Sequence, residues 1–159
     1  MKLQPPADLQ AVEGHRFVGF NSVIGHRIAL WRPGFVEMHL DIRPDLLNAG
    51  GVVHGGVLMS LLDSACGIAC SYDEGTSKRR YSLTLAFNAN FLKAASKGRL
   101  TIRAAKRGGG RNIFVCEAEI IDEAGDIVAT GSGTFRYRSG ERADANPGAP
   151  PQPDISAGS

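Results

Sequence analysis

The stretch from Asn48 to Asp63 carries groups that could hydrolyse a carbonyl compound. It reads NAGGVVHGGVLMSLLD, with Gly55 and Gly56 opening a helical pattern and a lone carboxylate two turns further in. Each glycine costs a helix about 1 kcal/mol relative to alanine, so this placement needs a reason. The N–H groups at a helix start attract an oxyanion, and glycines let a ligand approach them closely. The stretch therefore predicts a carbonyl-binding helix start.

Asp63 is the group in this stretch that can act as a base or as a nucleophile. Both roles need an ionised carboxylate, the usual form of aspartate at neutral pH, and the sequence leaves the choice open. Asn48 offers a side chain that could orient water or substrate. An ordinary structural interpretation also exists, because glycines are common in turns and a lone aspartate is usually solvated.

Hydrophobic spacing predicts the elements that position these groups. Gly56 to about Ser71 is expected to be one amphipathic helix, because apolar residues recur at helical spacing at Leu58, Leu61, Leu62, Ala65 and Ala69. Gly25 to Ile42 predicts two strands joined at Arg32-Pro33-Gly34. Alternating patterns predict further strands around 83–91, 100–102, 112–120 and 127–137. The order predicts an α+β fold in which one long helix lies on a single curved antiparallel sheet.

The side of this helix away from the apolar stripe is unusually free of charge. It carries Asp63 with Gly56, Ser60 and Gly67, and Asp63 is the only charged residue between Gly55 and Asp73. A solvated helix face usually carries lysine and glutamate. We therefore expect this side to be covered, most simply by a second copy of the chain.

The whole chain has the composition of a soluble globular protein. Its 159 residues suggest one domain, with 43% hydrophobic and 21% charged residues. We expect a loose lead-in at 1–19, the folded domain at 20–138 and a disordered, proline-rich tail at 139–159. The chain shows no apolar run long enough for a membrane helix and no signal peptide, so a cytoplasmic location without membrane contact is expected.

Basic residues concentrate in one zone of the chain. Between Lys78 and Arg111 there are ten Lys or Arg residues and no Asp or Glu, although the net charge is only +2. This zone predicts contact with an anion such as a phosphate, or else a solvated basic face. The aromatic residues there form no stacking motif, which argues against nucleic acid.

No metal or other cofactor is expected, since the histidines and cysteines do not fall into ligand spacing. Cys66, Cys70 and Cys116 are expected to be small buried residues, and their odd number fits a reducing compartment. The sequence KRGGGR is not a phosphate-binding P-loop, because no Lys-Ser or Lys-Thr follows the glycines.

The spacing Asn48-x5-His54-Gly55-Gly56, with Asp63 seven residues later, resembles the hotdog-fold acyl-CoA thioesterases of the PaaI (phenylacetate-pathway) type. The likeness continues in the predicted strands between residues 24 and 42, in LTLAFNANFLKAA (83–95) and in IIDEAGDIVATGSGTFRY (120–137). It covers roughly residues 20–138. The resemblance implies a hotdog fold, in which a curved antiparallel sheet wraps one long central helix, and an enzyme that hydrolyses an acyl-CoA to free acid and coenzyme A.

In that family two subunits pair their sheets edge to edge, and the active sites lie between them. The resemblance thus implies a homodimer with shared active sites, extended to a homotetramer. Gly55 or Gly56 would donate its N–H to the thioester carbonyl, and Asp63 of the facing subunit would attack or activate water.

Three further side chains take supporting roles by the same resemblance. Asn48 and His54 would help to place the substrate or water, and Thr84 falls near a position where the family often has a Ser or Thr close to the attacking water. The phosphates of coenzyme A would lie along the basic zone, for which charge and placement suggest Arg79, Arg80, Lys106, Arg107 and Arg111.

The main alternative is a non-catalytic acyl-CoA-binding or sensing protein on the same fold. It would keep the basic zone and lose the carboxylate, so the presence of Asp63 favours the enzyme. A dehydratase would need a His–acid arrangement that is absent from the sequence, and a purely structural homo-oligomer would leave the glycine pair unexplained.

Overall fold

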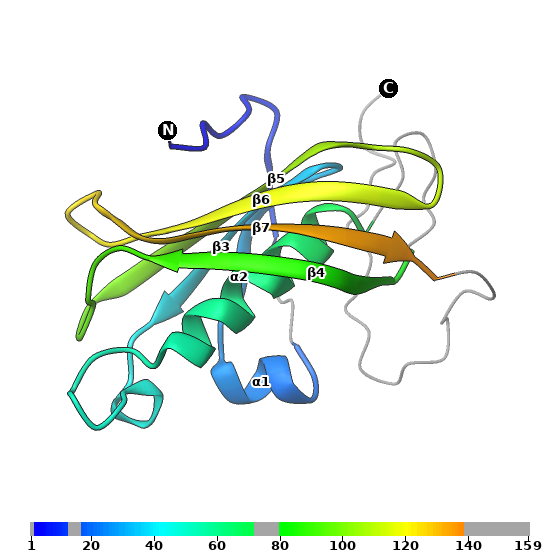
Figure 1. Cartoon of the computed structure of the whole chain (residues 1–159). Coiled ribbons are helices and arrows are strands. Elements are labelled where there is room, and N and C mark those ends of the chain that lie inside the picture. Colours follow the sequence, from blue (N-terminus) through cyan, green and yellow to red (C-terminus); the bar gives the residue numbers. More distant parts are fainter. Residues whose placement is uncertain (1, 13–16, 72–79, 139–159) are drawn as a thin grey trace.

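The computed structural model describes residues 2–12, 17–71 and 80–138, and in these residues a sheet curves over one long helix (Figure 1). The helices are α1 (Phe20–Ile24) and α2 (Gly55–Ala69), with a short 3-10 turn η1 (Pro44–Leu46). The strands are β1 (Gln10–Ala11), β2 (Arg27–Arg32), β3 (Phe35–Asp41), β4 (Ser82–Phe91), β5 (Arg99–Gly109), β6 (Ile113–Ile121) and β7 (Ile127–Tyr137). The predicted α+β class is confirmed.

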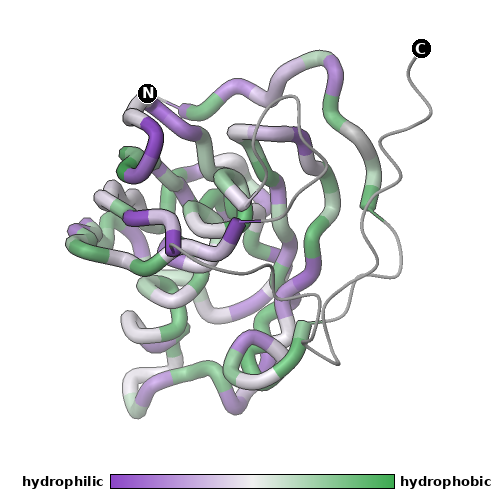
Figure 2. The backbone as a smooth tube through the Cα atoms, turned by 90° about the vertical axis from the view of Figure 1, so that its right-hand side faces the viewer, coloured by the Kyte–Doolittle hydropathy of each residue, from purple (hydrophilic) through white to green (hydrophobic). Residues whose placement is uncertain are grey.

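The described strands form one seven-stranded sheet in the order β1-β2-β3-β5-β6-β7-β4, and all neighbouring pairs are antiparallel. A view turned by 90° shows the strands curving around the central helix (Figure 2). β4 precedes β5 in the sequence but lies at the end of the sheet, where its only partner among the described strands is β7. Its other edge therefore remains available for pairing.

The apolar stripe of α2 faces the sheet as predicted. All five residues of the stripe are buried, together with Cys66. The helix starts one residue before the predicted start and ends two residues before the predicted end. Burying such a stripe supplies most of the stability of a helix of this length, because propensity alone is marginal below about 12–15 residues.

β2 and β3 form the predicted pair of strands, joined at Pro33-Gly34. Alternation with the apolar Val36 and Met38 predicts Glu37 on the solvated face of its strand, but the residue is only 8% exposed. The Nε of Arg103 donates to its carboxylate at 2.8 Å, and the carbonyl of Leu3 accepts from the same guanidinium. The N-terminal segment therefore covers this part of the outer sheet face.

Other residues before α1 also contact the sheet. β1 pairs with β2, and Leu3 is buried while its N–H donates to Glu119 at 2.8 Å. The predicted tail at 139–159 lies outside the described residues.

β4 departs from the predicted alternation because a bulge lies between Thr84 and Ala86. The alternation of apolar and polar residues predicts Leu83 and Leu85 on the buried face of the strand, but they are 45% and 52% exposed. Thr84 lies opposite the buried Phe135 and is thus turned toward α2. A bulge adds one residue to one strand and reverses which side chains face inward. Here it aims a hydroxyl at the helix.

The glycines of β7 allow the ring of Phe87 to approach closely. A Cβ at Gly131 or Gly133 would lie 2.7 Å or 2.5 Å from that ring. Glycines inside a strand are typical of strong bending or of a close helix approach. The structure shows instead an aromatic ring from the neighbouring strand.

Candidate active site

The start of α2 leaves one backbone donor open. His54 is the N-cap residue, and its Nδ1 accepts from the N–H of Gly56 at 2.9 Å. The carbonyl of His54 accepts the N–H groups of Val57 and Leu58. Among the described residues, nothing accepts from the N–H of Gly55. Of the two predicted donors, Gly55 is therefore the one available to a ligand, while Gly56 is engaged by the capping ring.

The capping hydrogen bond also determines which ring nitrogen of His54 can donate to a ligand. Because Nδ1 accepts a hydrogen bond, the neutral ring carries its proton on Nε2. The His54 side chain is exposed. Its Nε2–H is thus a second donor beside the helix start.

Asn48 shapes the loop that leads into α2. Its Oδ1 accepts from the N–H of Gly50 at 2.8 Å, and its own N–H donates to the carbonyl of Val52. Asparagine commonly closes turns in this way. The Oδ1 atom is therefore used inside the loop, and the amide nitrogen is the part of Asn48 left to contact a ligand.

Asp63 and Thr84 are brought together by the fold. The hydroxyl of Thr84 donates to Asp63 Oδ1 at 2.8 Å, and the Asp63 side chain is half-buried. Within the described part of the chain no group bonds the other carboxylate oxygen. Thr84 thus orients the carboxylate while one oxygen stays free to attack or to take a proton.

Gly55 and Asp63 of one chain cannot meet at one carbonyl group. They are eight residues apart on the same helix, which at 1.5 Å per residue separates their backbones by about 12 Å along the axis. A carbonyl carbon contacting both needs the two groups within about 3–3.5 Å of the reacting atoms. Such a site requires two copies of the chain.

Phe91 is a site residue that sequence reasoning missed. The alternation along residues 83–91 predicts Phe91 on the buried face of the strand, yet it is 52% exposed, and its ring lies 3.7 Å from the position that a Cβ of Gly55 would occupy. β4 runs antiparallel alongside α2, so that Thr84 reaches Asp63 and Phe91 reaches the helix start. In the sequence, Phe91 ends the strand that follows the long helix, and this position was the signal that could have identified it as a site residue.

Part of the basic zone, including Lys106 and Arg80, lies near the C-terminal end of α2, where the N–H of Arg80 donates to the carbonyl of Ser71. The N–H of Gly34 donates to Ala69, and the N–H of Lys106 donates to Gly34, which places Lys106 near the helix end. The helix spans about 20 Å from Gly55 to this end, at 1.5 Å per residue. Lys106 and Arg80 therefore lie apart from the Gly55 donor of the same chain.

The predicted basic residues have different partners. Arg80 stacks over Tyr137 with its guanidinium carbon 3.7 Å from the ring centre, and it donates to the carbonyl of Arg111. Arg107 Nε bonds Glu117 at 2.7 Å, so its charge is already paired. Lys106 and Arg111 are exposed, and Arg79 lies outside the described residues.

The three cysteines are buried and free, as predicted. A hydrogen bond with Cys116 and burial raise the pKa of the Cys70 thiol, which disfavours the reactive thiolate. In the described ranges no group of three His, Cys, Asp or Glu side chains gathers as metal ligands would, and none of the helices there is long and apolar enough to cross a membrane.

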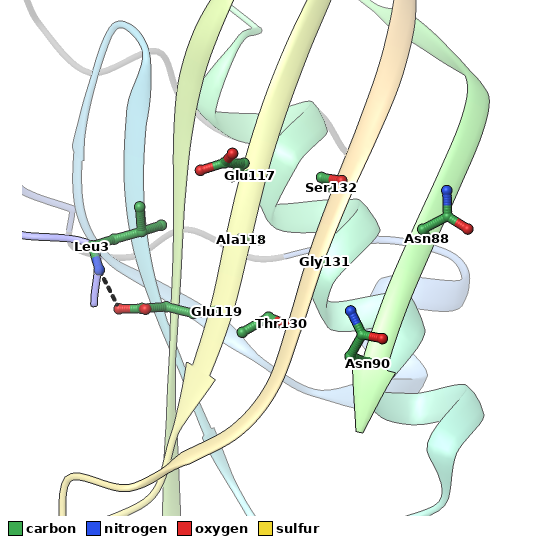
Figure 3. Close-up of a pocket in the computed structure, with 9 residues that line it drawn as sticks. All are labelled: Leu3, Asn88, Asn90, Glu117, Ala118, Glu119, Thr130, Gly131 and Ser132. Atoms are coloured by element: carbon green, nitrogen blue, oxygen red, sulfur yellow. Dashed lines mark hydrogen bonds between the residues drawn. The ribbon is translucent and has the colours of Figure 1, made fainter. Parts of the chain in front are cut away.

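A polar pocket of about 220 Å³ lies on the outer face of the sheet, away from α2 (Figure 3). Strand register places its side chains in two rows, each of an amide, a hydroxyl and a carboxylate: Asn88, Ser132 and Glu117, then Asn90, Thr130 and Glu119. Burial raises the pKa of Glu119 at the base of this pocket. Because the sheet separates the pocket from Asp63, it is not the place of the chemistry at α2.

Comparison with known proteins agrees with this fold. The model of the thioesterase superfamily matches residues 50–129, which include the whole of α2 and the bulged strand β4. A Mycobacterium tuberculosis protein classed as an esterase is 30% identical over 119 residues, covering 72% of this chain and 82% of its own. A medium/long-chain acyl-CoA thioesterase of Salmonella typhimurium is 22% identical, covering 73% of this chain and 83% of its own.

Among solved structures, the E. coli PaaI protein from the phenylacetic acid degradation operon is similar, with a TM-score of 0.67 and 27% identity. It covers 76% of this chain and 84% of its own. The chain belongs to the thioesterase superfamily. It is a thioester hydrolase with the hotdog fold, and the resemblance to the PaaI type is confirmed.

Proposed function

We propose that the chain hydrolyses an acyl-CoA to a free acid and coenzyme A. The observation that supports this most is the carboxylate of Asp63, oriented by Thr84 and left with one free oxygen. The open N–H of Gly55 at the helix start supplies the matching electrophilic element. A protein that only bound acyl-CoA would not need such a carboxylate beside its ligand.

In the proposed reaction, the thioester carbonyl accepts from the N–H of Gly55. The developing oxyanion is stabilised there by the helix start, and the exposed Nε2–H of His54 adds a donor. The amide nitrogen of Asn48 helps to place the substrate or water. These groups act without a cofactor of their own.

Asp63 of a second copy approaches the same carbonyl carbon. As a base it takes a proton from water while the water oxygen attacks, and the tetrahedral intermediate then expels the thiolate of coenzyme A, which takes up a proton. As a nucleophile its carboxylate attacks the carbonyl carbon and expels the thiolate of coenzyme A, which takes up a proton, and the resulting acyl anhydride is cleaved by water in a second step. Both routes use the oxygen that Thr84 leaves free.

The proposed assembly is a homodimer formed through the unpaired edge of β4, with two such dimers in a homotetramer. An exposed strand edge with apolar Leu83 and Leu85 is a ready site for pairing with another strand. Antiparallel pairing of two β4 edges brings α2 of one copy beside α2 of the other. This arrangement supplies the two groups that one chain keeps about 12 Å apart along its helix.

The phosphates of coenzyme A are proposed to contact the basic zone, with the exposed Lys106, Arg107 and Arg111 and the neighbouring Arg80 as candidates. Arg79, which lies outside the described residues, is a further candidate. The free energy of an anion is lower near a positively charged surface of this kind. A cytoplasmic location completes the proposal, since free cysteines persist in reducing compartments.

Substitution of Asp63 by Asn tests the proposed function. We expect release of free coenzyme A thiol from acyl-CoA to fall by orders of magnitude while the melting temperature is retained. Asp8→Asn is the matched control, because the Asp8 side chain is 72% exposed on an unrelated surface. Equal turnover by the Asp63→Asn variant and the control would remove Asp63 from the reaction.

A further inference from the structure

Helix α1 presents an exposed apolar face close to the catalytic carboxylate. Phe20 and Val23 are 67% and 68% exposed, and Val18 just before the helix is 48% exposed. Phe20 and Val23 are three residues apart and therefore share one side of α1. Single exposed apolar residues are ordinary, but a cluster of this kind usually marks a contact surface.

A side-chain bond fixes α1 next to α2. Ser64 Oγ donates to Asn21 Oδ1 at 3.0 Å, and Ser64 directly follows Asp63. α1 thus lies on the side of α2 away from the sheet (Figure 1). It lies beside the surface that the sequence predicted to be covered by a second copy.

Several side-chain interactions hold this five-residue helix in place. Two guanidinium nitrogens of Arg43 donate to the carbonyls of Ile24 and Val23 at 2.8 Å and 3.0 Å, and Asp45 binds the same guanidinium. Gly25 ends the helix with φ near +80°, and a Cβ there would lie 2.7 Å from the Arg43 side chain. A helix this short does not persist without such support.

The surface between Asp63 and α1 carries only small side chains. Asp63 and Ser64 are about 100° apart around the helix, and Gly56, Ser60 and Gly67 project within that arc. A flexible chain bound at the carboxylate can therefore cross α2 without meeting a large side chain. Packed helix axes lie about 8–10 Å apart, so only an acyl chain of several methylene groups reaches α1.

We propose that Phe20 and Val23 bind the distal part of the substrate acyl chain and give the enzyme a preference for medium and long alkyl acyl groups. This inference rests on the proposed function, since it places the acyl chain of an acyl-CoA next to Asp63. The residues act on chain-length specificity and leave the chemical step to Asp63.

The test compares decanoyl-CoA with propionyl-CoA in wild type and in the Phe20→Ser/Val23→Ser variant. We expect KM for decanoyl-CoA to rise about tenfold, because contact with several methylene groups is lost. The kinetics of propionyl-CoA should stay unchanged, and Phe20→Leu should keep the wild-type preference. Ile113→Ser/Val115→Ser is the matched control, since these residues are 45% and 40% exposed on the outer sheet face.

The possible results separate this inference from the proposed function. Wild type that cleaves both substrates, with the same decanoyl-CoA KM in the double variant, overturns the role of α1 and leaves the function standing. Wild type that cleaves no acyl-CoA overturns the function and the inference together. A double variant that elutes as a smaller species and loses both activities equally shows that α1 contacts a second copy, which also overturns the inference.

Discussion

Substitution of Gly55 by proline removes one backbone donor and little else. Gly55 is the first residue of α2, the position at which proline is most favourable in a helix. The preceding His54 has φ −61° and ψ 135°, a conformation that residues before proline readily adopt. The lost N–H has no acceptor within the described structure, so the helix gives up no hydrogen bond.

The expected effect is large on rate and small on stability. Loss of one oxyanion donor lowers kcat by roughly 10²–10³, or about 2.7–4 kcal/mol of transition-state stabilisation. A Cβ at this position meets the Phe91 ring at 3.7 Å, an ordinary contact. Because proline also restricts the unfolded chain, the melting temperature should be equal or slightly higher.

The assay follows release of free thiol from an acyl-CoA under saturating substrate, with Gly55→Ala as the control. The alanine variant adds a side chain of similar position but keeps the N–H, and it should retain most of its turnover. Full turnover by Gly55→Pro would refute the docking of the carbonyl at this amide.

Mixing the Gly55→Pro chain with an Asp63→Ala chain then tests whether the site is shared. Each variant alone is impaired at both sites of a homodimer. If the site takes Gly55 from one copy and Asp63 from the other, each mixed dimer has one site with both groups intact. Random exchange of subunits then restores about a quarter of wild-type activity. No recovery after verified subunit exchange would place both groups in one chain.

Two further substitutions probe the surroundings of the carboxylate and of coenzyme A. Thr84→Val removes the hydroxyl that donates to Asp63 at 2.8 Å, so kcat should fall about tenfold at unchanged melting temperature, while Thr84→Ser retains activity. A wild-type rate in the valine variant would deny Thr84 an orienting role. Neutralising Lys106, Arg107 and Arg111 to Gln should raise KM for acyl-CoA more than for an acyl thioester lacking the nucleotide. Equal changes for both substrates would locate the phosphates elsewhere.

Periodicity predicted the parts of the fold in which burial alone decides the conformation. The stripe from Leu58 to Ala69 packs on the sheet, and the turn at Pro33-Gly34 joins two antiparallel strands, as the sequence indicated. In both cases the local residue preferences and the packing of the core favour the same conformation. Alternation wrongly predicts a solvated Glu37, because the burial of this side chain depends on Arg103 and Leu3, which lie far away in the sequence.

The candidate site was predictable in its residues and less so in its geometry. The glycine pair and Asp63 were visible as a motif, but the choice between Gly55 and Gly56 depended on the ring of His54 acting as the N-cap. Phe91 was read as a core residue because alternation carries no information on how far a strand extends past the helix it packs against. α1 was not expected, since five residues are too few for a helical period to show.

The bulge in β4 links the proposed assembly with the proposed catalytic site. Without the extra residue, Thr84 would point to the outer face and Leu83 to the helix, so the carboxylate of Asp63 would face an apolar side chain. With it, the hydroxyl reaches Asp63 while Leu83 and Leu85 are turned outward at the edge proposed to pair with a second copy. One inserted residue thus places a polar group beside the carboxylate and apolar groups at the proposed interface. A register change in this strand would therefore alter both the proposed shared site and the proposed pairing of the two copies.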